Sequence, residues 1–452
     1  MKRWVWMNKV GLKSVSIIVA VGLLLSGCTP TMTLSVDGML EAPKLTSEQT
    51  VIHETVIASV GNNISLKYPK NGDNRSAFVI TDIDDEKTNE ALVFYERNNT
   101  LANESGLRVN ILDQDENGKW KSVYDLAGNG TDVDRILISK LGPADKKNII
   151  VGYSTMNIDE KTLQISSYDK GEFISSKYIE TYSLMEVFDI DRDGFNEIIT
   201  ASINLTDATA QVSLIEAVDS KIVKTDSVSL SANTTSFLSC KVGLVDNETP
   251  AIFIDCLKAT GEVQTEVIYY KYGKLQNPLI QIPDKLVDKT SRPTGFYSID
   301  IDSVGVVEIP TIENMTGYVD KEDEEMIYLT NWWAYGDYYT LTKKYSGYYN
   351  VSGGYAMMFP KRWQGGVTIK KDTSTDEVVF YKYIGSSIDD YMTELMRIAV
   401  VTKSSTQQYI HDGYEIIASQ GQLDFLVKLQ ADKKEPLILT MGEIQNSFLV
   451  VN

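Results

Sequence analysis

Cysteine and histidine are the scarcest side chains in this chain of 452 residues. There are three cysteines and two histidines, His53 and His411, which lie far apart in the sequence. The chain also has no HExxH zinc motif, no GxSxG nucleophile motif and no Walker-type phosphate loop. The sequence therefore offers no recognised catalytic motif, and acidic residues are too abundant for a carboxylate pair to be singled out.

Basic residues are outnumbered, with 43 Lys and Arg against 62 Asp and Glu and a formal net charge of −19. A surface of this sign repels nucleic acid and anionic lipid headgroups. We therefore expect no nucleic-acid partner. Apolar residues make up 43% of the chain, which is normal for a globular protein and does not indicate disorder.

Long apolar runs are also rare, and the clearest one, Val15–Leu25, follows a basic segment at the start of the chain. This pattern is typical of a signal peptide. The run ends in Leu-Ser-Gly-Cys, residues 25–28, which resembles the lipobox of bacterial lipoproteins. The resemblance implies that residues 1–27 are removed and that a lipid on Cys28 anchors the protein at the extracytoplasmic face of the cell membrane. A plain secretory signal or an uncleaved anchor is the alternative.

Removal of residues 1–27 would leave 39 basic and 62 acidic residues, a net charge of −23. With no polybasic patch and no second apolar span, attachment to the membrane would depend on the acyl chains. Residues 28–47 are small, polar and proline-containing, and are predicted to be a tether. A short helix is predicted to follow, at 47–60.

The two remaining cysteines, Cys240 and Cys256, lie at equal distances from the centre of the Asn-Glu-Thr turn at 247–249. In a tight hairpin they would lie opposite each other, and a disulfide would suit an exported protein. Two buried free thiols are the alternative.

One acidic motif recurs along the chain. Its best copy, Phe188–Ile199, places a glycine-containing acidic loop between two apolar segments, and weaker copies surround Glu90, Asn148, Pro250 and Glu308. The spacing between copies is roughly 50 to 60 residues. Alternating apolar residues and turn signals fill each interval, so each repeat is predicted to hold four antiparallel strands with the acidic loop between the first two.

Four-stranded units of this length are typical of a β-propeller. The D-x-D-x-D-G-x-x-E loop resembles the FG-GAP and VCBS repeats of integrin-type propellers over residues 64–345, although only the third unit carries the whole loop. We expect a mainly β protein with a β-propeller of about five blades in residues 48–345 and a small α+β domain in residues 346–452. A sixth blade or an array of β-sandwiches is the alternative.

The complete loop has the residues of a calcium site. Carboxylates stand at its first, third, fifth and ninth positions, a glycine stands at the sixth, and the seventh offers a carbonyl; the predicted ligands are Asp189, Asp191, Asp193, Phe195 and Glu197. The predicted role of Ca²⁺ is structural. The first loop is a weaker candidate because Lys87 replaces the glycine; its acidic residues are Asp82, Asp84, Glu86 and Glu90. An empty, solvated acidic turn is the alternative for each loop.

An aromatic run near the end of the repeats is a candidate ligand platform. It comprises Trp332, Trp333, Tyr335, Tyr338 and Tyr339. Aromatic faces stack on sugars and anchor interfaces. The alternative is a strand pair whose rings pack against the C-terminal domain.

These features together favour a non-enzymatic, lipid-anchored binding or scaffold protein that recognises envelope protein or wall polysaccharide. The second hypothesis is an envelope polysaccharide hydrolase or lyase that uses loop carboxylates on one face of the propeller. A third is an accessory lipoprotein whose C-terminal part binds a partner. A fold alone does not decide among them.

Overall fold

The computed structural model describes residues 44–98, 106–143, 147–156, 160–281, 285–318, 321, 326–336, 340–385, 388, 392–431 and 434–451. Cys28 and the predicted signal peptide lie outside these residues. Contacts divide the chain into two compact units, residues 1–54 and 55–452. Helix α3 (Ser47–Val60), which confirms the predicted helix, crosses this division. None of the helices in the described part is both long and apolar enough to cross a membrane.

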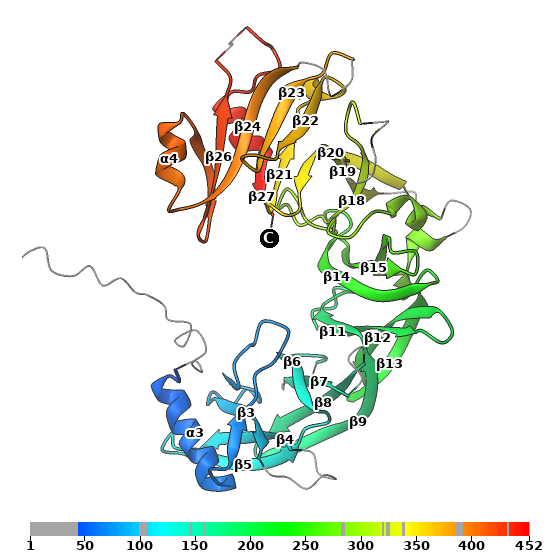
Figure 1. Ribbon diagram of the computed structural model, residues 1–452. Coiled ribbons are helices and arrows are strands. Elements are labelled where there is room, and N and C mark those ends of the chain that lie inside the picture. Colours follow the sequence, from blue (N-terminus) through cyan, green and yellow to red (C-terminus); the bar gives the residue numbers. More distant parts are fainter. Residues whose placement is uncertain are drawn as a thin grey trace, which may run out of the picture. The chain divides into compact units, whose positions relative to one another are not determined.

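The second unit is mainly β, as predicted. Its described strands form six antiparallel sheets that follow one another along the chain (Figure 1). The first sheet contains β1 (Ile64–Leu66), β2 (Phe78–Thr81), β3 (Glu90–Arg97), β4 (Leu107–Gln114) and β5 (Trp120–Ala127). The second contains β6 (Asp132–Ser139), β7 (Asn148–Ser154), β8 (Lys161–Asp169) and β9 (Glu172–Tyr182). The third contains β10 (Leu184–Phe188), β11 (Glu197–Asn204), β12 (Thr209–Val218) and β13 (Lys221–Ser229).

The later sheets are built from the remaining strands. The fourth contains β14 (Thr234–Leu244), β15 (Pro250–Lys258), β16 (Val263–Lys271) and β17 (Lys274–Gln276). The fifth contains β18 (Glu308–Asn314), β19 (Tyr328–Gly336), β20 (Thr340–Asn350), β21 (Tyr355–Met358) and β27 (Phe448–Val450). The sixth contains β22 (Val367–Asp372), β23 (Glu377–Lys382), β24 (Thr393–Thr402), β25 (Glu415–Gln420) and β26 (Leu423–Leu429). The short helices are α4 (Thr406–His411) and α5 (Met441–Ser447), with 3₁₀ turns η1 (Pro278–Ile280), η2 (Leu286–Thr290) and η4 (Lys361–Trp363).

Each sheet packs on the next through its inner strands. In β15, Ile252 packs with the third sheet, whereas the next residue, Phe253, packs with the fifth. In β7, Ile149 faces the first sheet and Ile150 faces the third. Successive strand residues point to opposite faces, so a strand covered on both sides needs an unbroken apolar run. This explains why the inner strands lack the alternation of a half-exposed sheet.

The predicted boundary between residues 345 and 346 lies inside β20. Beyond it, β21 pairs with β20, and β27 pairs with β21 through Ala356 and Leu449. A cluster that includes Met357 and Phe380 then joins the fifth sheet to the sixth. Residues 346–452 do contain both helices and strands, but they share a sheet and a core with the residues before them.

Candidate functional sites

The loop between β10 and β11 folds around its own aspartates. Asp189 Oδ2 accepts a hydrogen bond from the Gly194 amide at 3.0 Å. Asp191 Oδ1 accepts from the Asp193 amide at 3.1 Å. Gly194 has φ +94°, a backbone conformation that side chains other than glycine rarely adopt. The acidic residues therefore shape the turn as well as charging it.

Glu197 closes this loop from the first residue of β11. Its side chain is only 3% exposed, and its Oε2 accepts a hydrogen bond from the Ile190 amide at 2.9 Å. One oxygen from each of Asp189, Asp191 and Glu197 lies within 4.8 Å of the others. Asp189 Oδ1 is buried and has no hydrogen-bond partner. Three converging carboxylates with a free buried oxygen suit a hard cation such as Ca²⁺.

Burial and mutual repulsion both act against the charge of this cluster. Burial, the largest cause, raises the pKa of Glu197 to about 8, and the carboxylates of Asp191, Asp193 and Asp189 add to the rise. Burial also raises the pKa of Asp191. A cation would reverse both effects by favouring the charged form.

One of the predicted carboxylate ligands lies differently. Asp193 is not among the three converging carboxylates, and its Oδ1 accepts a hydrogen bond from the Phe195 amide at 2.8 Å. The structure therefore brings Asp189, Asp191 and Glu197 together and assigns Asp193 to the turn.

The same construction recurs in the first and fifth sheets. Glu90 Oε2 accepts from the Ile83 amide at 2.7 Å, and Glu308 Oε2 accepts from the Ile301 amide at 3.0 Å. In the first loop, Lys87 takes the backbone role of Gly194: its φ is +81° and its amide donates to Asp82 Oδ2 at 3.2 Å. The substitution that weakened the first loop as a sequence candidate is thus accommodated by the backbone.

The fifth loop receives a cation from the protein itself. Lys344, on β20, places Nζ 2.8 Å from Glu308 Oε1 and 3.5 Å from Asp302 Oδ2. The Tyr345 hydroxyl donates to the same Asp302 oxygen at 2.7 Å. Burial is the largest single influence on the pKa of Lys344 and lowers it, but the hydrogen bond to Glu308 and the charges of Glu308 and Asp302 together outweigh burial, so the net shift is upward. Lys344 could not be identified from the sequence as a partner of Glu308, because the two residues lie 36 positions apart.

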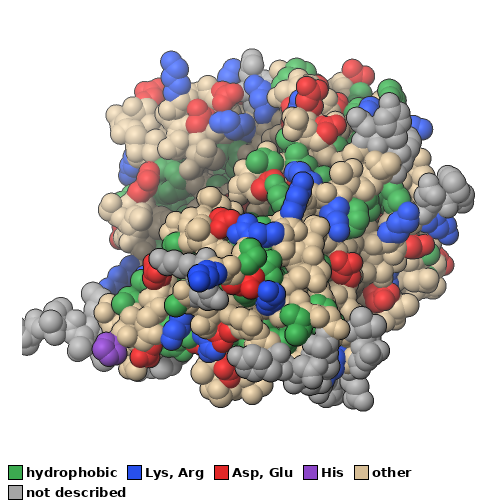
Figure 2. Space-filling model, turned by 90° about the horizontal axis from the view of Figure 1, so that it is seen from above, with side chains coloured by type: hydrophobic (Ala, Val, Ile, Leu, Met, Phe, Trp, Pro, Cys, Tyr) green, Lys and Arg blue, Asp and Glu red, His purple; other side chains and the backbone are tan. Residues whose placement is uncertain are grey.

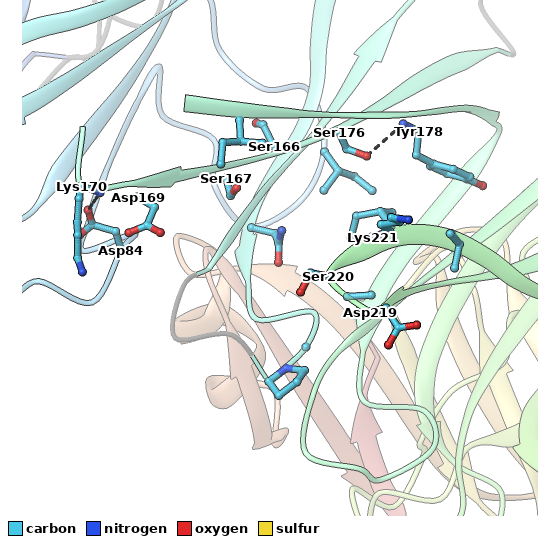
Figure 3. A pocket seen from close by; sticks show the side chains of 18 residues that line it. Asp84, Ser166, Ser167, Asp169, Lys170, Ser176, Tyr178, Asp219, Ser220 and Lys221 are labelled. Carbon is cyan, nitrogen blue, oxygen red and sulfur yellow. Dashed lines mark hydrogen bonds between the residues drawn. The ribbon is translucent and has the colours of Figure 1, made fainter. Parts of the chain in front are cut away.

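A groove of about 1040 Å³ lies between the second and third sheets (Figure 3). Hydroxyl groups of Ser166, Ser167, Ser176 and Ser220 line it, with charged side chains of both signs and a few aliphatic ones. In Figure 3, Asp84, Asp169 and Lys170 lie together at one end, and Tyr178 and Lys221 lie toward the other. Basic and acidic side chains are also interspersed on the face shown in Figure 2.

The described residues of the aromatic run are buried or half-buried. Trp332 is 1% exposed and packs with Ile301, while Tyr335 is 7% exposed and packs with Tyr269. Trp333 is half-buried, and its Nε1 donates to Thr311 at 2.8 Å. Tyr338 and Tyr339 lie outside the described residues. The platform prediction is wrong for Trp332 and Tyr335, because β19 is an inner strand whose rings fill the core.

The two cysteines are free thiols. The register of β14 and β15 places Cys240 opposite Ile254 and Cys256 opposite Phe237, so the pair is offset along the strands. The turn is centred one residue earlier than the symmetric spacing suggested, and β14 is bulged. Burial raises the pKa of both thiols. The predicted disulfide is therefore not formed, and the alternative of buried thiols describes Cys256.

Comparison with known proteins gives no family for this chain. No family model matches it, and no curated protein matches it. Among solved structures, it is similar to a protein of Bifidobacterium bifidum s17 named as an exo-β-1,3-galactanase, with a TM-score of 0.24 and 10% identity. That match covers 64% of this chain and 93% of the other. A likeness of this degree says nothing about activity.

Proposed function

We propose that the chain is a lipid-anchored binding protein on the extracytoplasmic face of the cell membrane, and that it binds its ligand in the groove between the second and third sheets. The observation that carries this proposal is the groove itself. Its volume of about 1040 Å³ slightly exceeds the usual range for ligand pockets, about 300–1,000 Å³. Anchoring through Cys28 rests on the lipobox resemblance. We also propose that the first five sheets are blades of a propeller-like array. In this proposal the loop between β10 and β11, called the third loop below, holds Ca²⁺ as a structural ion.

The lining of the groove favours an uncharged, hydroxyl-rich ligand. Asp84, Asp169 and Asp219 are set against Lys170 and Lys221, so the groove has no excess of positive charge. Serine hydroxyls and mixed charges provide both donors and acceptors for hydrogen bonds. A wall polysaccharide fits this chemistry better than a phosphate-rich polymer, which a net negative protein repels.

Binding of purified wall polysaccharide fractions to residues 28–452 tests the proposal. Ile174 lines the groove and is 49% exposed, so Ile174→Trp narrows the groove without disturbing the core. Ile179→Trp is the matched control, because Ile179 is on the same strand, is 62% exposed and lies outside the groove. We expect Ile174→Trp to weaken binding at least about ten-fold and the control to leave it unchanged. Equal binding by both variants, or no binding by the unmodified chain, would overturn the proposal.

A polysaccharide hydrolase is the second candidate because three carboxylates line the same groove. A glycosidase needs two carboxylates at a fixed separation, one of them as general acid. Release of new reducing ends from a bound polysaccharide, abolished in Asp169→Asn or Asp219→Asn, would favour this candidate. Binding without turnover would favour the binding protein.

A further inference from the structure

Two overlapping groups of carboxylates lie beside the first loop. Asp82, Asp84 and Glu90 form one group whose oxygens lie within 4.8 Å of one another, and Glu86, Glu90 and Asp113 form a second. Glu90 belongs to both groups. Asp113 does not come from the loop: it lies on β4, the strand that pairs with β3. The third loop receives no corresponding carboxylate from its neighbouring strand among the described groups of this kind.

Several oxygens in this cluster lack a partner. Glu90 is fully buried, and its Oε1 has no hydrogen-bond donor. The Oδ1 atoms of Asp82 and Asp113 are also buried and unpartnered. The ammonium group of Lys147 lies 3.3 Å from Asp85 and donates to the backbone carbonyl of Asp82 at 2.6 Å. Burying carboxylate oxygens without a donor or counter-charge costs several kcal/mol, and a bound cation would offset this cost.

We propose that this cluster binds a divalent cation of the Ca²⁺ type, with Asp113 as a ligand from outside the loop. All the available ligand atoms are oxygens, which excludes a site of the zinc-finger kind. Ca²⁺ accepts six to eight oxygen ligands in irregular geometry, whereas Mg²⁺ requires a near-ideal octahedron and retains water. Two carboxylate groups that share Glu90 and come from a loop and a neighbouring strand meet the first requirement better than the second.

The cation at this site links the first sheet to the second. Asp84 Oδ2 accepts a hydrogen bond from the Lys170 amide at 2.8 Å, and Asp113 Oδ2 accepts from the Tyr168 hydroxyl at 2.6 Å. Both donors belong to the hairpin formed by β8 and β9. A bound cation would therefore hold in place the carboxylates that contact this hairpin. One of them, Asp84, also lines the groove between the second and third sheets. This inference extends the calcium binding proposed for the third loop, but neither site depends on the other.

Calcium titration of residues 28–452 by calorimetry, after removal of metal by a chelator, tests the inference. We expect Asp113→Asn to remove the calcium site beside the first loop and Asp191→Asn to remove the calcium site in the third loop. Glu116→Gln is the control, because it makes the same change of charge at an exposed position in the adjoining turn. We expect Ca²⁺ to bind at least about ten-fold more tightly than Mg²⁺ at the site that Asp113 completes.

Hydrogen exchange of residues 161–182 provides a second readout. Ca²⁺ should slow exchange there in the unmodified chain and in Asp191→Asn, but not in Asp113→Asn. Tyr168→Phe retains all five carboxylates, so it should bind Ca²⁺ yet lose part of this protection, even if Asp113→Asn proves unstable. Unchanged stoichiometry in Asp113→Asn, or calcium binding without protection of the hairpin, would overturn the inference. If only Asp191→Asn loses a calcium site, the inference about the first loop is overturned, but the calcium site proposed for the third loop is supported.

Discussion

The third and fifth loops share one backbone design and differ in how they balance charge. In each, a buried glutamate accepts a hydrogen bond from the amide of the second loop residue, Ile190 or Ile301. In the third loop no lysine or arginine among the described residues pairs with the converging carboxylates, and burial raises the pKa of Asp191. In the fifth, Lys344 lies on Glu308. The loop geometry therefore does not determine the electrostatics; a side chain from a distant strand does.

The largest expected effect comes from removing the internal cation. Lys344→Met leaves Glu308 buried with no positive partner, and we expect the free energy of unfolding to fall by about 3 kcal/mol at neutral pH. Urea denaturation measures this change. Lys343→Met is the control, since Lys343 is the exposed neighbour that lies over Trp333. Ca²⁺ should restore part of the lost free energy of unfolding if the fifth loop of this variant binds the ion as the third loop does. An unchanged free energy of unfolding would show that Lys344 does not stabilise the loop.

A smaller effect is expected from calcium at the third loop. Saturating Ca²⁺ should stabilise the unmodified chain by about 2 kcal/mol, because it binds the folded state alone. Asp191→Asn should abolish the part of this gain that belongs to the third loop. Asp193→Asn should retain most of it, because asparagine can still accept from the Phe195 amide and Asp193 is outside the triad. Thermal unfolding with calcium and with chelator distinguishes the two, and equal losses in both variants would restore Asp193 as a ligand.

The smallest expected effect concerns the pH dependence of two aspartates at the same loop position, Asp302 in the fifth loop and Asp191 in the third. Burial alone would raise the pKa of Asp302. The Tyr345 hydroxyl and Lys344 oppose this effect and hold the pKa below its usual value of 3.8. Asp302 therefore contributes stability above its unfolded pKa, and this contribution is lost as pH falls through its lower folded pKa. The raised pKa of Asp191 has the opposite sign, so its contribution is lost as pH rises. A pH titration followed by carboxyl ¹³C chemical shifts, in the presence of chelator, should give a lower pKa for Asp302 than for Asp191. The reverse order would contradict the proposed difference between the two loops.

Local features of the fold were predictable from the sequence. The mainly β character, helix α3 and the three acidic loops follow from short-range patterns, and aligning Glu90, Glu197 and Glu308 was enough to expect a common role. The failures involve contacts between distant segments. The burial of Trp332 depends on Ile301 and Ala356, and the offset of Cys240 from Cys256 depends on strand bulges. The groove could not be predicted either, because it exists only where two separate sheets meet.

The pairing of β21 with β27 makes residues 359–447 an insertion within a hairpin. Met357 lies opposite Phe448, so the two ends of this long segment lie side by side. Closing so large a loop costs only slightly more conformational entropy than closing one of half the length. The sixth sheet can therefore be exchanged, in principle, for a short turn between β21 and β27. A variant without the sixth sheet would expose Tyr355 and Met357, and it would need polar residues at these positions to remain soluble.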